Sequence, residues 1–269
     1  MNRKLSDGKW HKRTLTDALF KYSIEYVMTD NDTFNPQLYD QLARISRAMA
    51  SPRRLELVDL LAQAERTVEA LAKLTGMSVA NTSRHLQALR GARLVMVRRA
   101  GLFAHYRLAD EGVFRLWQSV RDLGEARLAS VRELVERHFV RDGGLEPVGL
   151  RELLDRLRAG DVVLLDTRPE EEFRSGHIPG ALNMPVEELE ARLHVLPMDQ
   201  EVIAYCRGPY CMFSDQAVAL LHAHGYRARR FSLGFPDWRA AGMPIAGDPS
   251  PAPRALAAPP PAPGSELRP

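Results

Sequence analysis

The hydrophobic pattern of this chain changes its period near residue 145, and this change limits the possible folds more than any other feature. From Pro36 to about residue 139, apolar residues recur at the spacing of amphipathic helices. After residue 148, short apolar runs alternate with helical patterns, which is typical of a parallel sheet with helices on both faces. The sequence therefore predicts two domains, the first mainly α and the second α/β.

Composition along the chain sets the expected boundaries. The segment "RDGGLEP" at 141–147 has the residues of a linker, and the end of the chain is rich in Pro and Ala. We expect an N-terminal extension at 1–35, a helical domain at 36–140, an α/β domain at 148–245 and a disordered tail at 246–269.

The two halves carry opposite net charges. Residues 1–145 contain 24 Lys and Arg against 17 Asp and Glu, a net charge of +7. Residues 146–269 contain 13 against 17, a net charge of −4. A basic first half favours a polyanionic partner such as DNA, although many basic domains have no such partner.

The chain also lacks the signals of membrane and secreted proteins. It has no run of 18 apolar residues, and its first 20 residues lack the apolar core of a secretory signal. Its two cysteines are too few for a disulfide scaffold. We therefore expect a cytoplasmic protein with no membrane partner.

The first domain has the order of a winged helix-turn-helix. Ser51 and Pro52 suit the start of a helix, and "TGMS" forms a tight turn between two further helices. The segment "RLVMVRRAGLFAHYRL" reads as a hairpin. We expect helices at 36–50, 51–65, 67–76 and 78–92, the hairpin at 93–108 and one long helix at 110–139.

The helix after the turn presents residues suited to base edges. Its spacing buries Met77, Thr82, Leu86 and Leu89. Its other face carries short or hydrogen-bonding residues, and the hairpin adds two arginines suited to phosphates. The DNA-binding candidates are Ser78, Val79, Ala80, Asn81, Ser83, Arg84, Gln87, Arg98 and Arg99. The alternative is a small helical domain with a solvated polar face.

This half of the chain resembles the ArsR family of bacterial winged-helix repressors over residues 36–139. The segments "SRHLQALRGARLV" and "GLFAHYRL" carry the resemblance. It implies a homodimer joined through the first and last helices and bound to a near-palindromic operator. Many such proteins sense metals through cysteines, but residues 1–205 contain none. We expect no metal and no cofactor, and a surface role for His138 rather than a metal site.

In the second domain, both cysteines lie in "VIAYCRGPYCMFSDQA". We expect strands at 161–166, 201–206 and near 227–231, with helices near 148–159, 169–175, 186–194, 212–224 and 235–241. Ligands of a parallel sheet bind beyond the carboxyl ends of its strands, where Cys206 lies. Loop amides and a helix N-terminus there would lower the pKa of the thiol below its usual value of about 8.5. The alternative is that Cys206 is a small buried apolar residue.

This domain resembles the rhodanese family of sulfurtransferases over about residues 148–245. The segments "VVLLDTRPEEEFRSGHIPGALNMP", "CRGPYC" and "FSLGFPDWRAAGMPIA" carry the resemblance in the family's order. It implies that Cys206 is catalytic and carries sulfane sulfur as a persulfide, that Asp166 and Arg168 support the loop, and that His177 is structural. The implied active-site loop is Arg207, Gly208, Pro209, Tyr210 and Cys211.

Two features of the loop narrow its chemistry. A phosphatase of related fold needs Cys-x5-Arg, but the sixth residue after Cys206 is Met212. Cys211 stands where thiosulfate-active relatives often carry a cation, which argues against efficient thiosulfate turnover. Cys211 is either a tolerated helix-start residue or a resolving thiol that attacks a modified Cys206.

Together these patterns predict a DNA-binding regulator, expected to be a repressor, whose rhodanese domain senses or carries sulfane sulfur. Its expected partners are operator DNA, a second copy of the chain, small sulfur donors and thiol acceptors. The first alternative is an active sulfurtransferase whose DNA-binding half acts independently. The second is a scaffold without either activity.

Overall fold

The computed structural model describes residues 34–138 and 146–247. The expected extension at 1–35, the linker at 141–147 and the tail at 246–269 lie wholly or mostly outside the described residues. The boundary between two compact units falls after Ala50, and every described element from Ser51 onward belongs to the second unit. The expected limits of the two domains stay predictions.

The first described element is helix α2, Phe34–Met49. It begins two residues before the expected start at Pro36 and ends one residue before the expected end. Leu38, Leu42 and Ile45 are exposed, although their spacing places them on one apolar face.

Helices α3, α4 and α5 form the helix-turn-helix as expected. They span Pro52–Gln63, Val68–Thr75 and Val79–Gly91. The Thr67 hydroxyl accepts a hydrogen bond from the Ala70 amide at the start of α4, and Gly76 ends that helix at a φ of +66°. The Ser78 hydroxyl caps α5 in the same way through the Asn81 amide. These side chains satisfy amides that the first turn of a helix leaves unpaired.

A three-stranded antiparallel sheet follows, in the order β1-β3-β2. The expected hairpin is strands β2, Val95–Ala100, and β3, Phe103–Leu108. Strand β1, Arg66–Thr67, was not expected, because two residues between helices give no alternating pattern to read. It pairs with β3 through Arg66 opposite Tyr106, and it directly precedes α4 in the chain.

The long helix expected at 110–139 is two helices, α6 at Glu111–Arg127 and α7 at Ala129–His138. Leu128 between them is extended, with φ −105° and ψ 107°. The expectation was wrong because apolar spacing continues across the break, and no proline marks it. Gly124, a weak helix former, provides the only local sign.

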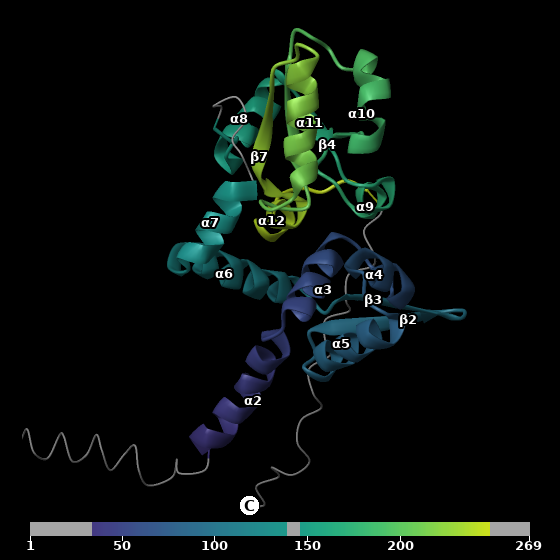
Figure 1. Ribbon diagram of the computed structural model, residues 1–269, viewed down its shortest axis with the longest axis vertical. Helices are drawn as coiled ribbons and strands as arrows, with labels where there is room; N and C mark the ends of the chain where they lie inside the picture. The colour runs from purple at the N-terminus through teal and green to yellow at the C-terminus, as the bar shows by residue number, and fades with distance from the viewer. Residues whose placement is uncertain (1–33, 139–145, 248–269) are drawn as a thin grey trace, which may run out of the picture. The chain divides into compact units, whose positions relative to one another are not determined.

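The α/β part contains a parallel sheet in the order β5-β4-β6-β7. Figure 1 labels β4 and β7 of this sheet together with α11. The strands are Leu182–Asn183, Val162–Asp166, Glu201–Cys206 and Ala228–Gly234. The helices are α8 at Leu150–Ala159, α9 at Glu170–Ser175, α10 at Val186–Arg192, α11 at Met212–Ala223 and α12 at Phe235–Ala240, with a short 3-10 turn at Leu193–Val195. Only β5 was not expected.

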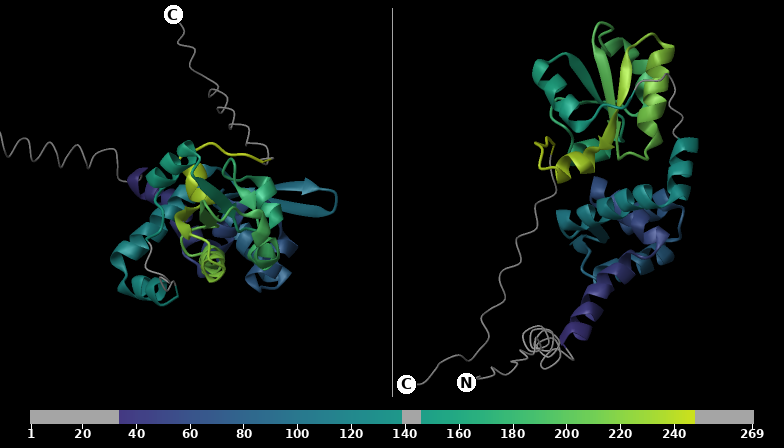
Figure 2. Two further views of the ribbon diagram at one scale, coloured as in Figure 1. Left: turned by 90° about the horizontal axis from the view of Figure 1, so that it is seen from above. Right: turned by 90° about the vertical axis from the view of Figure 1, so that its left-hand side faces the viewer.

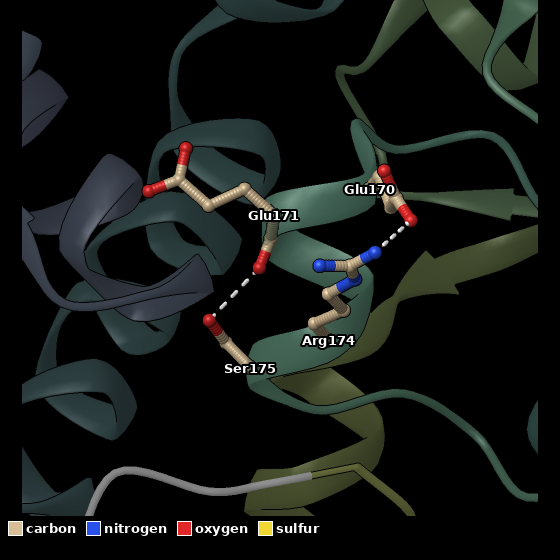
Figure 3. A pocket seen from close by; sticks show the side chains of 4 residues that line it. All are labelled: Glu170, Glu171, Arg174 and Ser175. Carbon is tan, nitrogen blue, oxygen red and sulfur yellow. Dashed lines mark hydrogen bonds and ion pairs between the residues drawn. The ribbon is translucent and has the colours of Figure 1, made fainter.

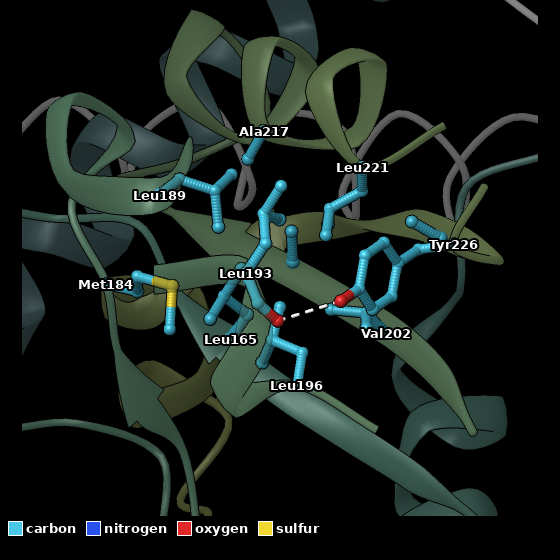
Figure 4. Close-up of a cluster of buried hydrophobic side chains, with 11 residues drawn as sticks. Leu165, Met184, Leu189, Leu193, Leu196, Val202, Ala217, Leu221 and Tyr226 are labelled. Carbon is cyan, nitrogen blue, oxygen red and sulfur yellow. Dashed lines mark hydrogen bonds between the residues drawn. The ribbon is translucent and has the colours of Figure 1, made fainter. Parts of the chain in front are cut away.

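Helices cover both faces of this sheet (Figure 2). Because side chains alternate along a strand, Leu164 and Leu165 enter different cores. Leu165 packs with residues of α10 and α11, including Leu189 and Leu221 (Figure 4). Leu164 packs on the other face with residues of α8 and α12. The sheet is therefore buried on both sides, and its strand ends are fixed in place.

No helix within the described ranges combines the length and the apolar character that crossing a bilayer requires.

The two-sided core predicts a large cost for truncating Leu165, whose side chain is fully buried. We expect Leu165→Ala to lower the free energy of unfolding by about 2–5 kcal/mol, because a buried cavity remains. Its pairing partner on the adjacent strand β5 is Leu182, which is 41% exposed. Leu182→Ala should cost about 1 kcal/mol or less. Urea unfolding of the full chain measures both, and equal losses would contradict this packing.

Candidate functional site

The outer surface of α5 has the residues expected for base contact. Its inner face buries Thr82, Leu86 and Leu89, whereas Met77, expected to be buried, is half-buried. The predicted DNA-facing residues of α5 are all exposed or half-exposed: Ser78, Val79, Ala80, Asn81, Ser83, Arg84 and Gln87. An exposed α5 with short side chains can approach a groove closely.

The two arginines of the hairpin lie on β2 rather than in its turn. The turn itself is Gly101 and Leu102, where Gly101 has a φ of +58°. Arg98 Nη2 lies 2.6 Å from Glu65 Oε1, so its guanidinium is held at the side of the sheet. Arg99 is exposed, next to the turn. Both remain predicted phosphate contacts.

The cysteine loop lies at the carboxyl end of β6, as expected. Cys206 is the last residue of that strand and is only 1% exposed. Cys211 stands at the N-cap of α11 and is half-exposed. The two residues form a disulfide, with their Cα atoms 6.2 Å apart. The five-residue spacing therefore brings both sulfur atoms to one place.

Hydrogen bonds shape the loop between the cysteines. The Cys211 amide donates to the Gly208 carbonyl oxygen over 3.1 Å, which closes a turn. Arg230 Nη1 donates to the Pro209 carbonyl oxygen. Burial, followed by the hydrogen bond and charge of Glu125, raises the pKa of the Tyr210 hydroxyl. The phenol in this loop is therefore kept neutral.

Gly234 forms the support under this loop. Strand β7 pairs Gly234 with Cys206. A Cβ atom at position 234 would lie 2.3 Å from the Gly208 nitrogen and 2.4 Å from the Arg207 carbonyl carbon. Such distances are far below van der Waals contact, so only glycine lets the two main chains approach this closely.

Asp166 and Arg168, which were predicted to support the loop, form a buried ion pair at the end of β4. Arg168 Nη2 lies 2.6 Å from Asp166 Oδ2 and donates to the Gly176 carbonyl oxygen over 2.8 Å. Its guanidinium lies 4.4 Å from the centre of the Phe235 ring. These contacts hold the ends of β4 and α9 rather than residues 207–211. The nearer link to the loop is Thr167, whose hydroxyl donates to the Tyr205 carbonyl oxygen.

His177, expected to be structural, is packed within the α/β part. Its ring stacks on Phe173 with the ring centres 3.6 Å apart. Its Nδ1 lies 2.9 Å from the Phe173 carbonyl oxygen, and its amide donates to the Ala246 carbonyl oxygen.

Glu172 joins the cysteine loop to the helix-turn-helix part of the same compact unit. Its carboxylate is fully buried and accepts hydrogen bonds from Arg207 Nη2 over 2.6 Å and Arg66 Nη2 over 2.5 Å. Gln63 Nε2 at the end of α3 donates to the Arg207 carbonyl oxygen over 3.0 Å. Arg207 is therefore held by its side chain and its main chain.

A second buried contact links α12 to α6. Asp237 Oδ1 accepts hydrogen bonds from Arg121 Nη2 over 2.7 Å and from Gln118 Nε2 over 2.9 Å. Its other oxygen accepts from the Gly234 amide over 3.0 Å. The glycine under the loop is thereby connected to a helix of the DNA-binding half.

The outer side of α9 differs sharply from its inner side. Glu170 pairs with Arg174 at the surface, and the Ser175 hydroxyl donates to the Glu171 carbonyl oxygen (Figure 3). The Glu171 side chain is 70% exposed, whereas that of Glu172 is fully buried. One turn of helix thus carries solvated carboxylates and the buried carboxylate.

Sequence reasoning missed Gln63, Arg66, Glu172 and Asp237 as residues of the site. In "RPEEEF" the three glutamates have the same residue type, and no local pattern separates the third from the first two. Arg66 occurs in a two-residue strand without periodicity. Only tertiary structure brings these residues together.

Two families match separate parts of the chain. Residues 51–97 match the family described as bacterial regulatory protein, arsR family. Residues 150–241 match the rhodanese-like domain. The first range contains α3 to α5, and the second contains the cysteine loop.

Known proteins match one or both halves. HTH-type transcriptional regulator Rv0324 of Mycobacterium tuberculosis is 44% identical over 208 residues, which cover 77% of this chain and 91% of that protein. A sulfurtransferase of Allochromatium vinosum is 37% identical over 86 residues, covering 32% of this chain and 78% of its own. A solution structure of a homodimeric winged helix-turn-helix domain from Mycobacterium bovis, a possible ArsR-family regulator, is 43% identical with a TM-score of 0.36, covering 38% of this chain and 95% of that one.

The buried Glu172 predicts a strong asymmetry between neighbouring glutamates. We expect Glu172→Gln to lower the free energy of unfolding by about 3–5 kcal/mol, because it removes the buried carboxylate that Arg66 and the half-buried Arg207 share. Glu170→Gln, the matched control, removes a carboxylate that pairs with Arg174 at the surface and should change it by less than about 1 kcal/mol. Denaturant unfolding of both variants measures the difference. Similar values for the two would contradict a buried, shared carboxylate.

Proposed function

The chain belongs to the ArsR family of bacterial regulatory proteins and carries a C-terminal rhodanese-like domain, and from this we propose that the sulfur state of Cys206 controls its affinity for operator DNA. The observation that carries the proposal is the position of Arg207. This residue follows Cys206 in the chain and is hydrogen-bonded to Glu172 and Gln63 in partly buried contacts.

On the DNA side, α5 enters the major groove and reads base edges through Asn81, Arg84 and Gln87. Arg98 and Arg99 of β2 contact phosphates, which add affinity without base specificity. A regulator bound across an operator blocks transcription, so we propose a repressor. It acts in the cytoplasm, where bacterial DNA is found.

We propose that the DNA-binding form is a homodimer. On α2 the apolar side chains of Leu38, Leu42 and Ile45 are exposed, and on α6 those of Val120 and Leu123 are exposed. Exposed apolar side chains on α2 and on α6 each suit a self-complementary interface. Two copies present two recognition helices, which matches a near-palindromic operator.

On the sulfur side, the Cys206 thiolate attacks the outer sulfur of a sulfane donor. A bond forms between the two sulfur atoms, the donor's own sulfur–sulfur bond breaks, and the remaining donor leaves with the electron pair. Cys206 then carries a persulfide. The Cys211 thiolate attacks the inner sulfur, forms the Cys206–Cys211 disulfide and releases hydrosulfide. The Cα separation of 6.2 Å supports this second step.

The extra sulfur has mechanical consequences because Cys206 is only 1% exposed. Adding an atom to a packed position costs about 1–3 kcal/mol unless the surroundings move. The loop cannot move toward Gly234, where the main chains already touch. It therefore moves away from β7, and this displacement strains the bonds that Arg207 makes with Glu172 and Gln63.

The strain reaches the DNA-binding elements through Arg66. This residue shares the Glu172 carboxylate, pairs with Tyr106 of β3 and immediately precedes Thr67, the cap of α4. The hairpin and the helix-turn-helix thus both adjoin the strained contact. A coupling of about 1–3 kcal/mol is typical of such two-site systems and is enough to change DNA affinity.

We expect a polysulfide donor to change the affinity of the full chain for its operator by about 5- to 150-fold, which corresponds to this coupling energy. The operator is first selected from random DNA with the full chain, and affinity is then measured by fluorescence anisotropy. Cys206→Ser should bind DNA with unchanged affinity in the presence of the donor, because it cannot form a persulfide.

Cys211→Ser separates the two modified forms. It retains a response if the persulfide is sufficient and loses it if the disulfide is required. An unaltered affinity of the wild type after confirmed modification of Cys206 would overturn the proposal. It would favour the alternative, a working sulfurtransferase whose DNA-binding half acts independently, which the match to a sulfurtransferase supports.

Arg84 tests the position of the recognition helix. We expect Arg84→Ala to weaken operator binding by about 1–3 kcal/mol, because a base or phosphate contact is lost. Arg90 is the matched control, since six residues place it about 240° around the same helix. Arg90→Ala should have a clearly smaller effect in the same anisotropy assay. Equal effects of the two variants would mean that another face of α5 contacts DNA.

A further inference from the structure

A cavity of about 330 Å³ lies beside the cysteine loop, within the compact unit that begins at Ser51. One part of its wall comes from the loop and the start of α11, including Cys211 and Phe213. The other part comes from the DNA-binding half, including Asp59 and Leu60 of α3 and Trp117 of α6. The volume suits a small molecule near the disulfide.

The two sulfur atoms of the disulfide are not equally accessible. Cys211 lines the cavity and is half-exposed. Cys206 is 1% exposed and is not among the residues that line the cavity. A thiol that enters the cavity therefore meets the sulfur of Cys211 first, and Cys206 is the leaving sulfur.

The charges in the wall are unequally compensated. Both arginines of the wall pair with buried carboxylates, Arg121 with Asp237 over 2.7 Å and Arg207 with Glu172 over 2.6 Å, and Glu172 is shared with Arg66. Asp59 instead accepts a hydrogen bond from the uncharged indole of Trp117 over 3.0 Å.

The surroundings of Asp59 stabilise its ionised form only weakly. Burial is the largest influence on its carboxyl and raises the pKa, outweighing the Trp117 hydrogen bond and the arginine charges. The remaining carboxylate of the wall, Glu56, lies 2.9 Å from Arg53 in an exposed ion pair. Among the described residues that line the cavity, Asp59 is the carboxylate without an ion pair, and the charges of Arg121 and Arg207 act on it from within the wall.

We propose that this cavity admits the small thiol that reduces the Cys206–Cys211 disulfide, and that Asp59 selects neutral or cationic thiols over anionic ones. The inference rests on the disulfide state of the proposed function. It adds the class of reductant and assigns its selection to a residue of the DNA-binding half.

The reduction balances with two equivalents of thiol. The first thiolate attacks the sulfur of Cys211, a mixed disulfide forms there, and the Cys206–Cys211 bond breaks with its electron pair on Cys206. A second thiolate attacks the sulfur of the bound thiol and releases Cys211 as a thiolate. The two thiols are oxidised to one disulfide, and the protein gains two electrons.

The test compares three thiols on the oxidised full chain: cysteamine, 2-mercaptoethanol and 2-mercaptoethanesulfonate, which carry positive, zero and negative charge besides the thiol. Loss of the disulfide is followed by mass spectrometry after alkylation, and rates are divided by thiolate concentration. At low salt, we expect the rate constant of the anionic thiol to be about one tenth of that of the cationic thiol, or lower.

Asp59→Asn removes the charge while its side-chain oxygen can still accept the Trp117 hydrogen bond, so it should reduce the ratio of rates to near that in a small model disulfide. Glu190→Gln is the matched control. Glu190 is exposed on α10, and the substitution removes the same negative charge away from the cavity. It should leave the ratio unchanged. A merely structural role of Asp59 would change all three rates together.

The site of attack is read from the same samples. Trypsin cleaves after Arg207 and places Cys206 and Cys211 in different peptides. When the reaction is stopped early by alkylation, the thiol adduct should appear on Cys211 and the alkyl group on Cys206. An adduct on Cys206, or equal rate ratios in wild type and Asp59→Asn, would overturn the proposal.

The outcomes separate this inference from the proposed function. If the donor-treated chain forms no Cys206–Cys211 bond, the disulfide state and this inference both fail. If the bond forms and controls DNA affinity but the thiols show no charge preference, only the inference fails. If the preference is found while DNA affinity never changes, the cavity stands and the regulatory proposal falls.

Discussion

The structure depends most on the sharing of one buried carboxylate, that of Glu172, between two arginines. A charge taken out of water is stable only when its partners are close and well oriented, so this contact tolerates little displacement. One arginine follows Cys206, and the other begins strand β1, which leads into α4. The helix-turn-helix part and the α/β part are thereby joined by an interaction that depends strongly on geometry. A contact made of apolar side chains would adapt more easily and would transmit less.

The cysteine loop and the helices α3 and α6 line the same cavity. The cysteine loop is held at the end of a sheet buried on both faces, so its position is set by the α/β core. The residues that surround its accessible sulfur come partly from α3 and α6. A rhodanese-like domain alone would lack Asp59 and Trp117 and would present a different surface to thiols. The proposed selection of thiols therefore depends on residues from both parts of the chain.

Most of the fold follows from the sequence because its patterns are strong and local. The period of apolar residues predicted α3, α4 and α5, and Ser51, Gly76 and Ser78 predicted the start of α3, the end of α4 and the start of α5. The break at Leu128 could not be predicted, because the apolar spacing continues across it. Cys206 and its loop were identified from their place after a buried strand. Glu172 and Arg66 were missed because burial of a charge is a property of the assembled structure, and the sequence around each reads as an ordinary solvated surface.

Gly234 gives the loop a hard floor made of main chain. A floor of side chains could change rotamers and absorb an added atom, but two touching backbones have no such freedom. In the proposed function, an atom added to Cys206 therefore displaces the loop away from β7. Gly234 thus limits the directions in which the loop can move, because its main chain lies directly against that of Arg207 and Gly208.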